Sequence, residues 1–104
     1  MEISIEELRK LCKDETIIIT HHALERCRER GISFTDIKTA IMTGEVIENY
    51  PDAYPSPCCL LLSTGEILLH VVAGIRDGLL WIITAYVPTL DKWEPDYKTR
   101  KVEE

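Results

Sequence analysis

The chain has 104 residues, of which 45% are hydrophobic and 29% charged, and this composition argues against a disordered chain. We expect one domain over residues 1–104, with its core from about residue 4 to residue 100 and a flexible tail at 101–104. The formal net charge is −6. It argues against a generally basic nucleic-acid-binding protein, since affinity for phosphates comes mainly from Lys and Arg, and leaves a local basic face as the alternative.

Neither a membrane segment nor a metal site is expected. No apolar run approaches the roughly 20 residues of a membrane-spanning helix, and the N-terminus is acidic rather than signal-like, so we expect a cytoplasmic protein. Cys58 and Cys59 are adjacent, and Cys12 and Cys27 lie in predicted helices, so free thiols are expected. No cysteine pair has the spacing of a structural zinc site, so no metal or cofactor is predicted.

The first third of the chain carries helix signals. Ser4 and Glu7 have the spacing of a capping box, which predicts a helix over residues 4–13. Residues 16–19 are β-branched and predict an extended segment or a short edge strand. Thr20 can cap a helix over residues 21–30 that Gly31 ends.

A third helix and a sheet follow. Ser33 and Asp36 begin a helical pattern with an apolar stripe, which Gly44 ends. The apolar pattern then predicts strands near 46–47, 58–62, 66–73 and 79–87. The last three have short connections, which require antiparallel neighbours. The prediction is an α+β fold with N-terminal helices packed on a roughly four-stranded antiparallel sheet.

The predicted second helix carries three candidate site residues. His22, Arg26 and Arg30 are spaced four apart, which puts an imidazole and two guanidiniums on one helix face. An imidazole suits proton transfer, and guanidiniums bind phosphate oxygens. The alternative is a salt-bridged surface, because Glu25 and Glu29 alternate with these cations. His21 is interpreted as a residue of the helix start.

Two further candidates lie in the predicted strands. His70 lies in an apolar strand. It is interpreted either as a catalytic residue or as a structural residue whose ring has a hydrogen-bond partner. Tyr86 is the matching candidate on the next strand. If Asp77 and Gly78 form a two-residue turn, His70 and Tyr86 face opposite sides of the sheet, and only a bulge or a longer loop brings them together.

The end of the chain contains Trp93 and Arg100. An exposed aromatic ring beside cations can stack on nucleic-acid bases. The alternative is that Trp93 packs the helices against the sheet.

Several segments in order carry a family resemblance: His22-Ala23-x-x-Arg26-x-x-x-Arg30-Gly31-Ile32-Ser33, Gly44-Glu45-Val46-Ile47, His70-Val71-Val72 and Ile83-Thr84-Ala85-Tyr86-x-Pro88, followed by Trp93 and Arg100. Over residues 16–101 the chain resembles the domain-of-unknown-function family 4258. That family is similar to the RelE- and BrnT-like bacterial toxins, small α+β proteins that cut RNA without metal. The resemblance implies a RelE-like fold and a cognate antitoxin, with a zinc-ribbon region in some relatives.

The leading hypothesis is a metal-independent endoribonuclease of a toxin-antitoxin pair that binds RNA. His22, His70 and Tyr86 are the expected catalytic residues, and Arg26, Arg30, Trp93 and Arg100 the expected phosphate- or RNA-binding residues. Toxins of this type are usually basic, whereas this chain is acidic. The alternatives are a protein-interaction module that docks an acidic partner and a degenerate toxin that keeps the fold without activity.

Overall fold

A computed structural model describes residues 2–102 and contains three helices and five strands in that range. In chain order these are α1 (Ile5–Lys10), β1 (Ile17–Ile19), α2 (His21–Arg30), α3 (Phe34–Thr43), β2 (Glu45–Tyr50), β3 (Cys58–Ser63), β4 (Leu69–Arg76) and β5 (Leu79–Tyr86). No helix of the described residues has the length and apolar character needed to traverse a lipid bilayer.

The predicted helix boundaries are confirmed where capping residues mark them. Ser4 and Ser33 each form a capping box at the start of α1 and α3, and the Thr20 side chain accepts a hydrogen bond from the Ala23 backbone at the start of α2. Gly31 ends α2 in the left-handed conformation, with φ of 69°. Helix α1 ends at Lys10, three residues before the predicted end.

The sheet has five strands in the order β1-β5-β4-β3-β2. Strands β2 to β5 form the predicted antiparallel meander. The prediction of four antiparallel strands is corrected by β1, which pairs parallel to β5 with Ile18 opposite Trp81 and makes the sheet mixed. Parallel pairing follows from the chain path, because α2, α3 and three strands separate β1 from β5 and allow the chain to return in the same direction.

Two β-bulges interrupt the ladders. In β5 the extra residue is Ile83, since Val72 pairs with Thr84 whereas Ala73 pairs with Ile82. In β2 the extra residue is Ile47, between the Val46 and Glu48 pairs. Each bulge moves the residues beyond it to the other face of the sheet, because side chains alternate with a period of two.

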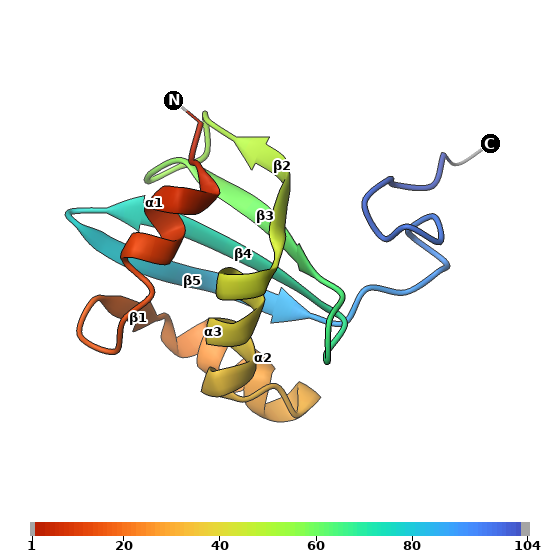
Figure 1. Ribbon diagram of the computed structural model, residues 1–104, viewed down its shortest axis with the longest axis horizontal. Coiled ribbons are helices and arrows are strands. Elements are labelled where there is room, and N and C mark those ends of the chain that lie inside the picture. Colours follow the sequence, from red (N-terminus) through yellow and green to blue (C-terminus); the bar gives the residue numbers. More distant parts are fainter. Residues whose placement is uncertain (1, 103–104) are drawn as a thin grey trace.

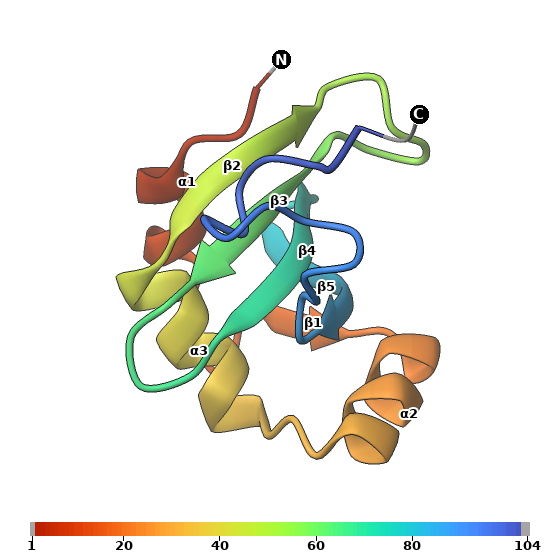
Figure 2. The same cartoon turned by 90° about the vertical axis from the view of Figure 1, so that its right-hand side faces the viewer.

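Helices α1 and α3 cover one face of the sheet, and α2 packs against β5 (Figure 1). The core lies under the helices and includes Leu8, Ile37, Ile41, Leu61, Val71 and Ile82. Figure 2 shows that the end of the chain crosses the opposite face of the sheet, which we call the outer face. The outer face therefore lies between the strands and the C-terminal segment.

Residues 88–102 form this segment, here called the C-terminal strap. The Arg100 guanidinium makes two 2.9 Å hydrogen bonds to the Glu48 carboxylate, and Lys98 forms an ion pair with Glu45. The backbone N–H of Lys101 donates to the carbonyl of Lys92 at 3.0 Å. Lys98 and Arg100 thus attach the strap to β2, and the Lys101 bond closes the strap on itself. A flexible tail was predicted at 101–104, and its residues 103–104 lie outside the described range.

Candidate functional site

A cleft of about 490 Å³ opens where the end of α2, the end of β5 and the C-terminal strap meet. Its lining contains three cations, Arg30, Lys92 and Arg100, and one carboxylate, Asp91. The phenol of Tyr86 and the ring of Trp93 also line it. In a chain with a net charge of −6, this is a local concentration of positive charge suited to an anion.

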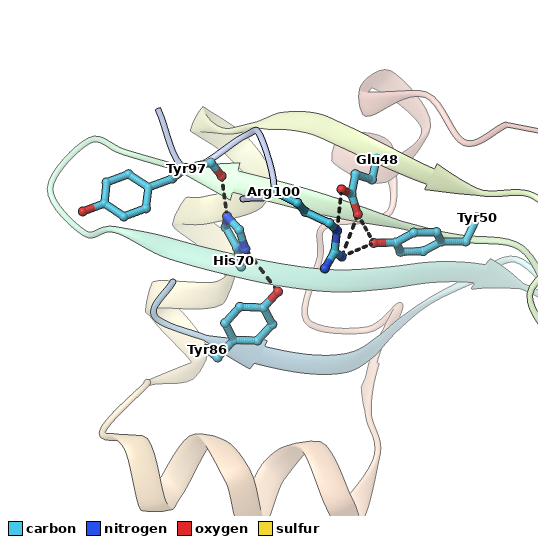
Figure 3. A network of polar contacts seen from close by, with 6 residues as sticks. All are labelled: Glu48, Tyr50, His70, Tyr86, Tyr97 and Arg100. Atoms are coloured by element: carbon cyan, nitrogen blue, oxygen red, sulfur yellow. Dashed lines mark hydrogen bonds and ion pairs between the residues drawn. The ribbon is translucent and has the colours of Figure 1, made fainter. Parts of the chain in front are cut away.

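Behind the cleft, His70 connects β4 to β5 and to the strap (Figure 3). Its Nδ1 lies 3.2 Å from the hydroxyl of Tyr86, and its Nε2 lies 2.8 Å from the carbonyl oxygen of Tyr97. A carbonyl oxygen can only accept, so Nε2 carries a proton and donates it. In the neutral ring Nδ1 is then unprotonated and accepts the hydrogen bond of the Tyr86 hydroxyl.

Burial keeps both partners in their neutral forms. His70 is fully buried, and desolvation lowers the pKa of its imidazole, opposed by the hydrogen bond to Tyr97. Desolvation also raises the pKa of the Tyr86 phenol. At neutral pH the site therefore holds an uncharged imidazole and a protonated phenol that share one hydrogen bond.

The bulge at Ile83 explains why these two residues meet. The turn at Asp77 and Gly78 pairs Arg76 with Leu79, which on its own would put His70 and Tyr86 on opposite faces. The extra residue in β5 shifts the register, so that His70 pairs directly with Tyr86. Of the two arrangements considered from the sequence, the bulge is the one observed.

Arg100 is held in place by a carboxylate and an aromatic ring. It hydrogen-bonds to Glu48 and lies 4.7 Å above the centre of the Trp93 ring. The hydrogen bonds from Arg100 lower the pKa of Glu48. Tyr50 donates a hydrogen bond to Glu48 as well, and burial followed by this contact raises the pKa of Tyr50 to about 12.

The three candidates on α2 do not stay together. Arg30 lines the cleft, and its Nη1 donates to the carbonyl of Ala85 at 2.7 Å. Arg26 forms a surface ion pair with Glu29 at 3.1 Å. His22 is exposed and is not part of the cleft lining, since it precedes Arg30 by two helical turns, about 12 Å along the axis. The structure therefore brings together Arg30, Tyr86, His70, Trp93 and Arg100, but not His22 or Arg26.

Trp93 differs from both expectations for it. It is only 3% exposed, so its ring does not offer an exposed stacking surface. It also does not pack the helices against the sheet, because it lies on the outer face with its ring 4.5 Å from that of His70, in an edge-to-face arrangement. The strap places it there, between His70 and Arg100.

Sequence reasoning missed four residues of this region: Lys92, Glu48, Tyr50 and Tyr97. Lys92 was detectable in principle as a cation beside Trp93. Glu48 and Tyr50 reach the outer face only because of the bulge at Ile47. Tyr97 contributes a backbone carbonyl, for which residue type gives no signal.

None of the four cysteines lines the cleft. All four cysteines are free thiols. Cys58 and Cys59 are consecutive in β3 and so point to opposite faces of the sheet, with Cys59 in the core. Across residues 2–102, no three His, Cys, Asp or Glu side chains are grouped so that they could hold a metal ion.

The burial of His70 leads to a prediction about stability. As pH falls below 6.5, the ordinary pKa of histidine, the unfolded chain takes up a proton that the buried His70 resists until lower pH. The unfolded state then binds more protons, so the free energy of unfolding of the wild type should fall through this range. The pKa of Glu48 is also lowered, but the contribution of Glu48 to the free energy of unfolding is lost only below about pH 4.5.

The measurement is urea unfolding from pH 8 to pH 5 with wild type and His70→Gln. Glutamine does not titrate, so the variant should show a flatter profile between pH 6.5 and pH 5, and both proteins keep the exposed His21 and His22. Equal loss of stability in the two proteins would contradict a depressed pKa for His70.

Comparison with known proteins identifies the family. The sequence profile described as domain of unknown function (DUF4258) matches residues 19–87, about two thirds of the chain. Neither curated proteins nor solved structures gave a match. The matched range includes Arg30, His70 and Tyr86, and ends before the C-terminal strap. This chain therefore belongs to the DUF4258 family.

Proposed function

We propose that this protein is a metal-independent endoribonuclease of toxin type, similar to the RelE- and BrnT-like toxins. The observation that carries the proposal is the convergence of Arg30, Lys92 and Arg100 on one cleft with the phenol of Tyr86, whose hydroxyl is hydrogen-bonded to a neutral, buried His70. Phosphodiester cleavage needs positive charge around a phosphate and a group that accepts a proton from the attacking hydroxyl. The cleft contains both.

Tyr86 and His70 form the proton-accepting part of the proposed mechanism. The Tyr86 hydroxyl donates to Nδ1 of His70, which leaves the phenol oxygen free to accept. As the 2′-hydroxyl of RNA attacks the adjacent phosphorus, its proton passes to the Tyr86 oxygen and the Tyr86 proton passes to Nδ1. His70 becomes an imidazolium, which the Tyr97 carbonyl stabilises through Nε2.

The cations carry the rest of the reaction. The bond from phosphorus to the 2′-oxygen forms and the bond to the 5′-oxygen breaks, giving a 2′,3′-cyclic phosphate and a 5′-hydroxyl end. The departing 5′-oxygen takes a proton from water, and His70 later returns its proton to solvent. Arg30, Lys92 and Arg100 stabilise the charge that develops on the phosphoryl oxygens.

The partner of a toxin of this type is a cognate antitoxin, in some relatives one with a zinc-ribbon region. We propose such a partner, encoded by an adjacent reading frame. Its role would be to cover the cleft and keep the cations from RNA. The chain as a whole is acidic, whereas toxins of this type are usually basic. RNA binding by this chain would therefore depend on the local positive charge of the cleft.

The experiment is cleavage of single-stranded RNA by purified protein in the presence of a chelator, with Arg30→Ala and Arg28→Ala compared. Both variants remove one arginine from the end of α2, but only Arg30 lines the cleft, whereas Arg28 is exposed elsewhere on the helix. We expect wild-type cleavage without metal and a loss of RNA affinity in Arg30→Ala. In this variant the slope of the logarithm of the RNA binding constant against the logarithm of the salt concentration should become shallower by about one unit. Arg28→Ala should behave like wild type.

Three outcomes would contradict the proposal. If the wild-type protein cleaves no RNA, the proposed activity is wrong. If a chelator abolishes cleavage, the metal-independent mechanism is wrong. Equal effects of Arg30→Ala and Arg28→Ala remove the cleft as the site. RNA with a 2′-deoxy substitution at the cleaved position must resist cleavage, since it lacks the attacking hydroxyl.

A second candidate is a protein-interaction module, or a degenerate toxin that has kept only its binding surface. One observation favours it: on α2 outside the cleft, His22 is exposed and Arg26 is partly exposed and paired with Glu29. This face of α2 could dock an acidic partner protein. Absence of RNA cleavage by wild type, together with a stable complex with the product of the adjacent reading frame, would decide for this candidate.

A further inference from the structure

Tyr97 holds its backbone in a conformation that a tyrosine rarely adopts. Its φ is 57°, and among the described residues only one other non-glycine residue, Asp77, has a positive φ. Asp77 lies in the Asp-Gly hairpin turn, where the turn type demands this conformation. Tyr97 lies in the C-terminal strap, and for an aromatic side chain the left-handed region is costly. Some local interaction must hold it there.

Asp96 supplies that interaction. Its carboxylate accepts hydrogen bonds from the backbone N–H groups of Lys98 and Thr99 at 2.9 and 3.0 Å, and from the Thr99 hydroxyl at 2.9 Å. The turn is closed further by the N–H of Tyr97, which donates to the Glu94 carbonyl at 2.8 Å. These bonds fix the chain on both sides of Tyr97.

The result of this turn is the direction of one carbonyl group. The Tyr97 carbonyl points at Nε2 of His70 with a distance of 2.8 Å (Figure 3). His70 is fully buried, and its described ring hydrogen bonds are those to Tyr97 and Tyr86. A buried imidazole has few ways to satisfy its N–H, so the position of this acceptor decides which nitrogen is protonated.

We propose that the Asp96–Tyr97 turn is a positioning device that fixes the tautomer of His70. With Nε2 protonated, Nδ1 accepts from Tyr86 and can take its proton. With Nδ1 protonated instead, the imidazole donates to the Tyr86 oxygen and cannot receive a proton from it. The strap therefore determines whether Tyr86 can act as a proton acceptor. The catalytic consequence rests on the proposed ribonuclease function, whereas the tautomer itself does not.

A pair of substitutions at Tyr97 separates backbone from side chain. Tyr97→Gly and Tyr97→Val both remove the aromatic ring, but glycine adopts a positive φ freely, while a β-branched valine strongly disfavours it. The carbonyl should stay in place in Tyr97→Gly and turn away in Tyr97→Val. Asp96→Ala removes the carboxylate that holds the turn and should resemble Tyr97→Val.

The primary measurement is the protonation of each ring nitrogen of His70, followed by ¹⁵N NMR at pH 8 in the full chain, with His70→Gln used to assign the signal. Wild type and Tyr97→Gly should show the form with Nε2 protonated. Tyr97→Val and Asp96→Ala should show a substantial population with Nδ1 protonated. If the protein cleaves RNA, kcat should fall about 10- to 100-fold in Tyr97→Val and in Asp96→Ala. Losses of this size are typical when a functional histidine loses the hydrogen-bond partner that orients its ring.

The outcomes distinguish this inference from the proposed function. A tautomer that is unchanged in Tyr97→Val and Asp96→Ala, in protein that remains folded by circular dichroism, overturns the positioning role whatever the activity. Equal changes in Tyr97→Gly and Tyr97→Val also overturn it, because the ring and not the backbone would then be responsible. A changed tautomer in protein without RNA cleavage supports the positioning role and removes only the ribonuclease.

Discussion

His70→Gln is expected to reduce the rate of RNA cleavage about 10² to 10⁴-fold, the usual contribution of a group that transfers a proton in the transition state. A glutamine side chain can donate its amide N–H to the Tyr97 carbonyl and accept from the Tyr86 hydroxyl, as the imidazole does. It cannot accept a proton. The variant can therefore keep both hydrogen bonds, but it loses the ring contact with Trp93 and the group that accepts the proton.

The measurement is the single-turnover rate at pH 7, with thermal unfolding of the same samples to show that the fold is retained. His21→Gln is the matched control, because it makes the same change at an exposed residue paired with Glu25 on α2. Tyr86→Phe should lose activity to a similar extent, since it removes the oxygen that receives the proton. Unchanged cleavage by His70→Gln would show that His70 is a structural residue of the outer face.

The parts of the fold that local sequence determines were predictable. Ser4, Thr20 and Ser33 supply side-chain oxygens for helix starts, and Gly31 supplies the left-handed residue that ends α2. These signals act over three or four residues, so they can be read without tertiary structure. The parallel pairing of β1 with β5 depends on the return of the chain after two helices and three further strands, and no local pattern encodes it.

The candidate site was predictable only in part because it depends on register. His70 and Tyr86 were recognisable by residue type, and the sequence left open whether they share a face. The bulge at Ile83 decided this, and a second bulge at Ile47 put Glu48 within reach of Arg100. A bulge adds one residue to one strand, and its position follows from packing on both faces rather than from the alternation of apolar and polar residues.

The three candidates on α2 do not all line the cleft, because the helix is longer than the cleft. Residues four apart share a face, but the same face extends about 12 Å from His22 to Arg30. Of the three candidates, only Arg30, the last residue of α2, lines the cleft, and it also donates a hydrogen bond to the Ala85 carbonyl of β5. The other half of the cleft comes from residue 88 onward, where the sequence offered no predicted element.

Trp93→Ala is expected to lower the free energy of unfolding by about 3 to 5 kcal/mol, the cost of truncating a buried tryptophan. Trp93 is the main apolar anchor of the strap on the outer face: it is 3% exposed, and its ring contacts that of His70 and lies under Arg100. Without it the strap should separate from the sheet and carry Lys92 and Arg100 away from the cleft. RNA binding should be lost along with stability.

The comparison that isolates this effect is Trp81→Ala, measured by urea unfolding beside Trp93→Ala. Trp81 lies on β5 at the other end of the outer face, where its partly buried ring lies against Arg76. Removing it should cost less, because less apolar surface is buried there, and it should leave the strap and the cleft intact. If Trp93→Ala lowered the free energy of unfolding by less than about 1 kcal/mol, its effect would be little larger than that of an ordinary surface substitution. The ion pairs of Arg100 and Lys98 would then hold the strap on their own. Because exposed ion pairs contribute so little, we expect the tryptophan to dominate.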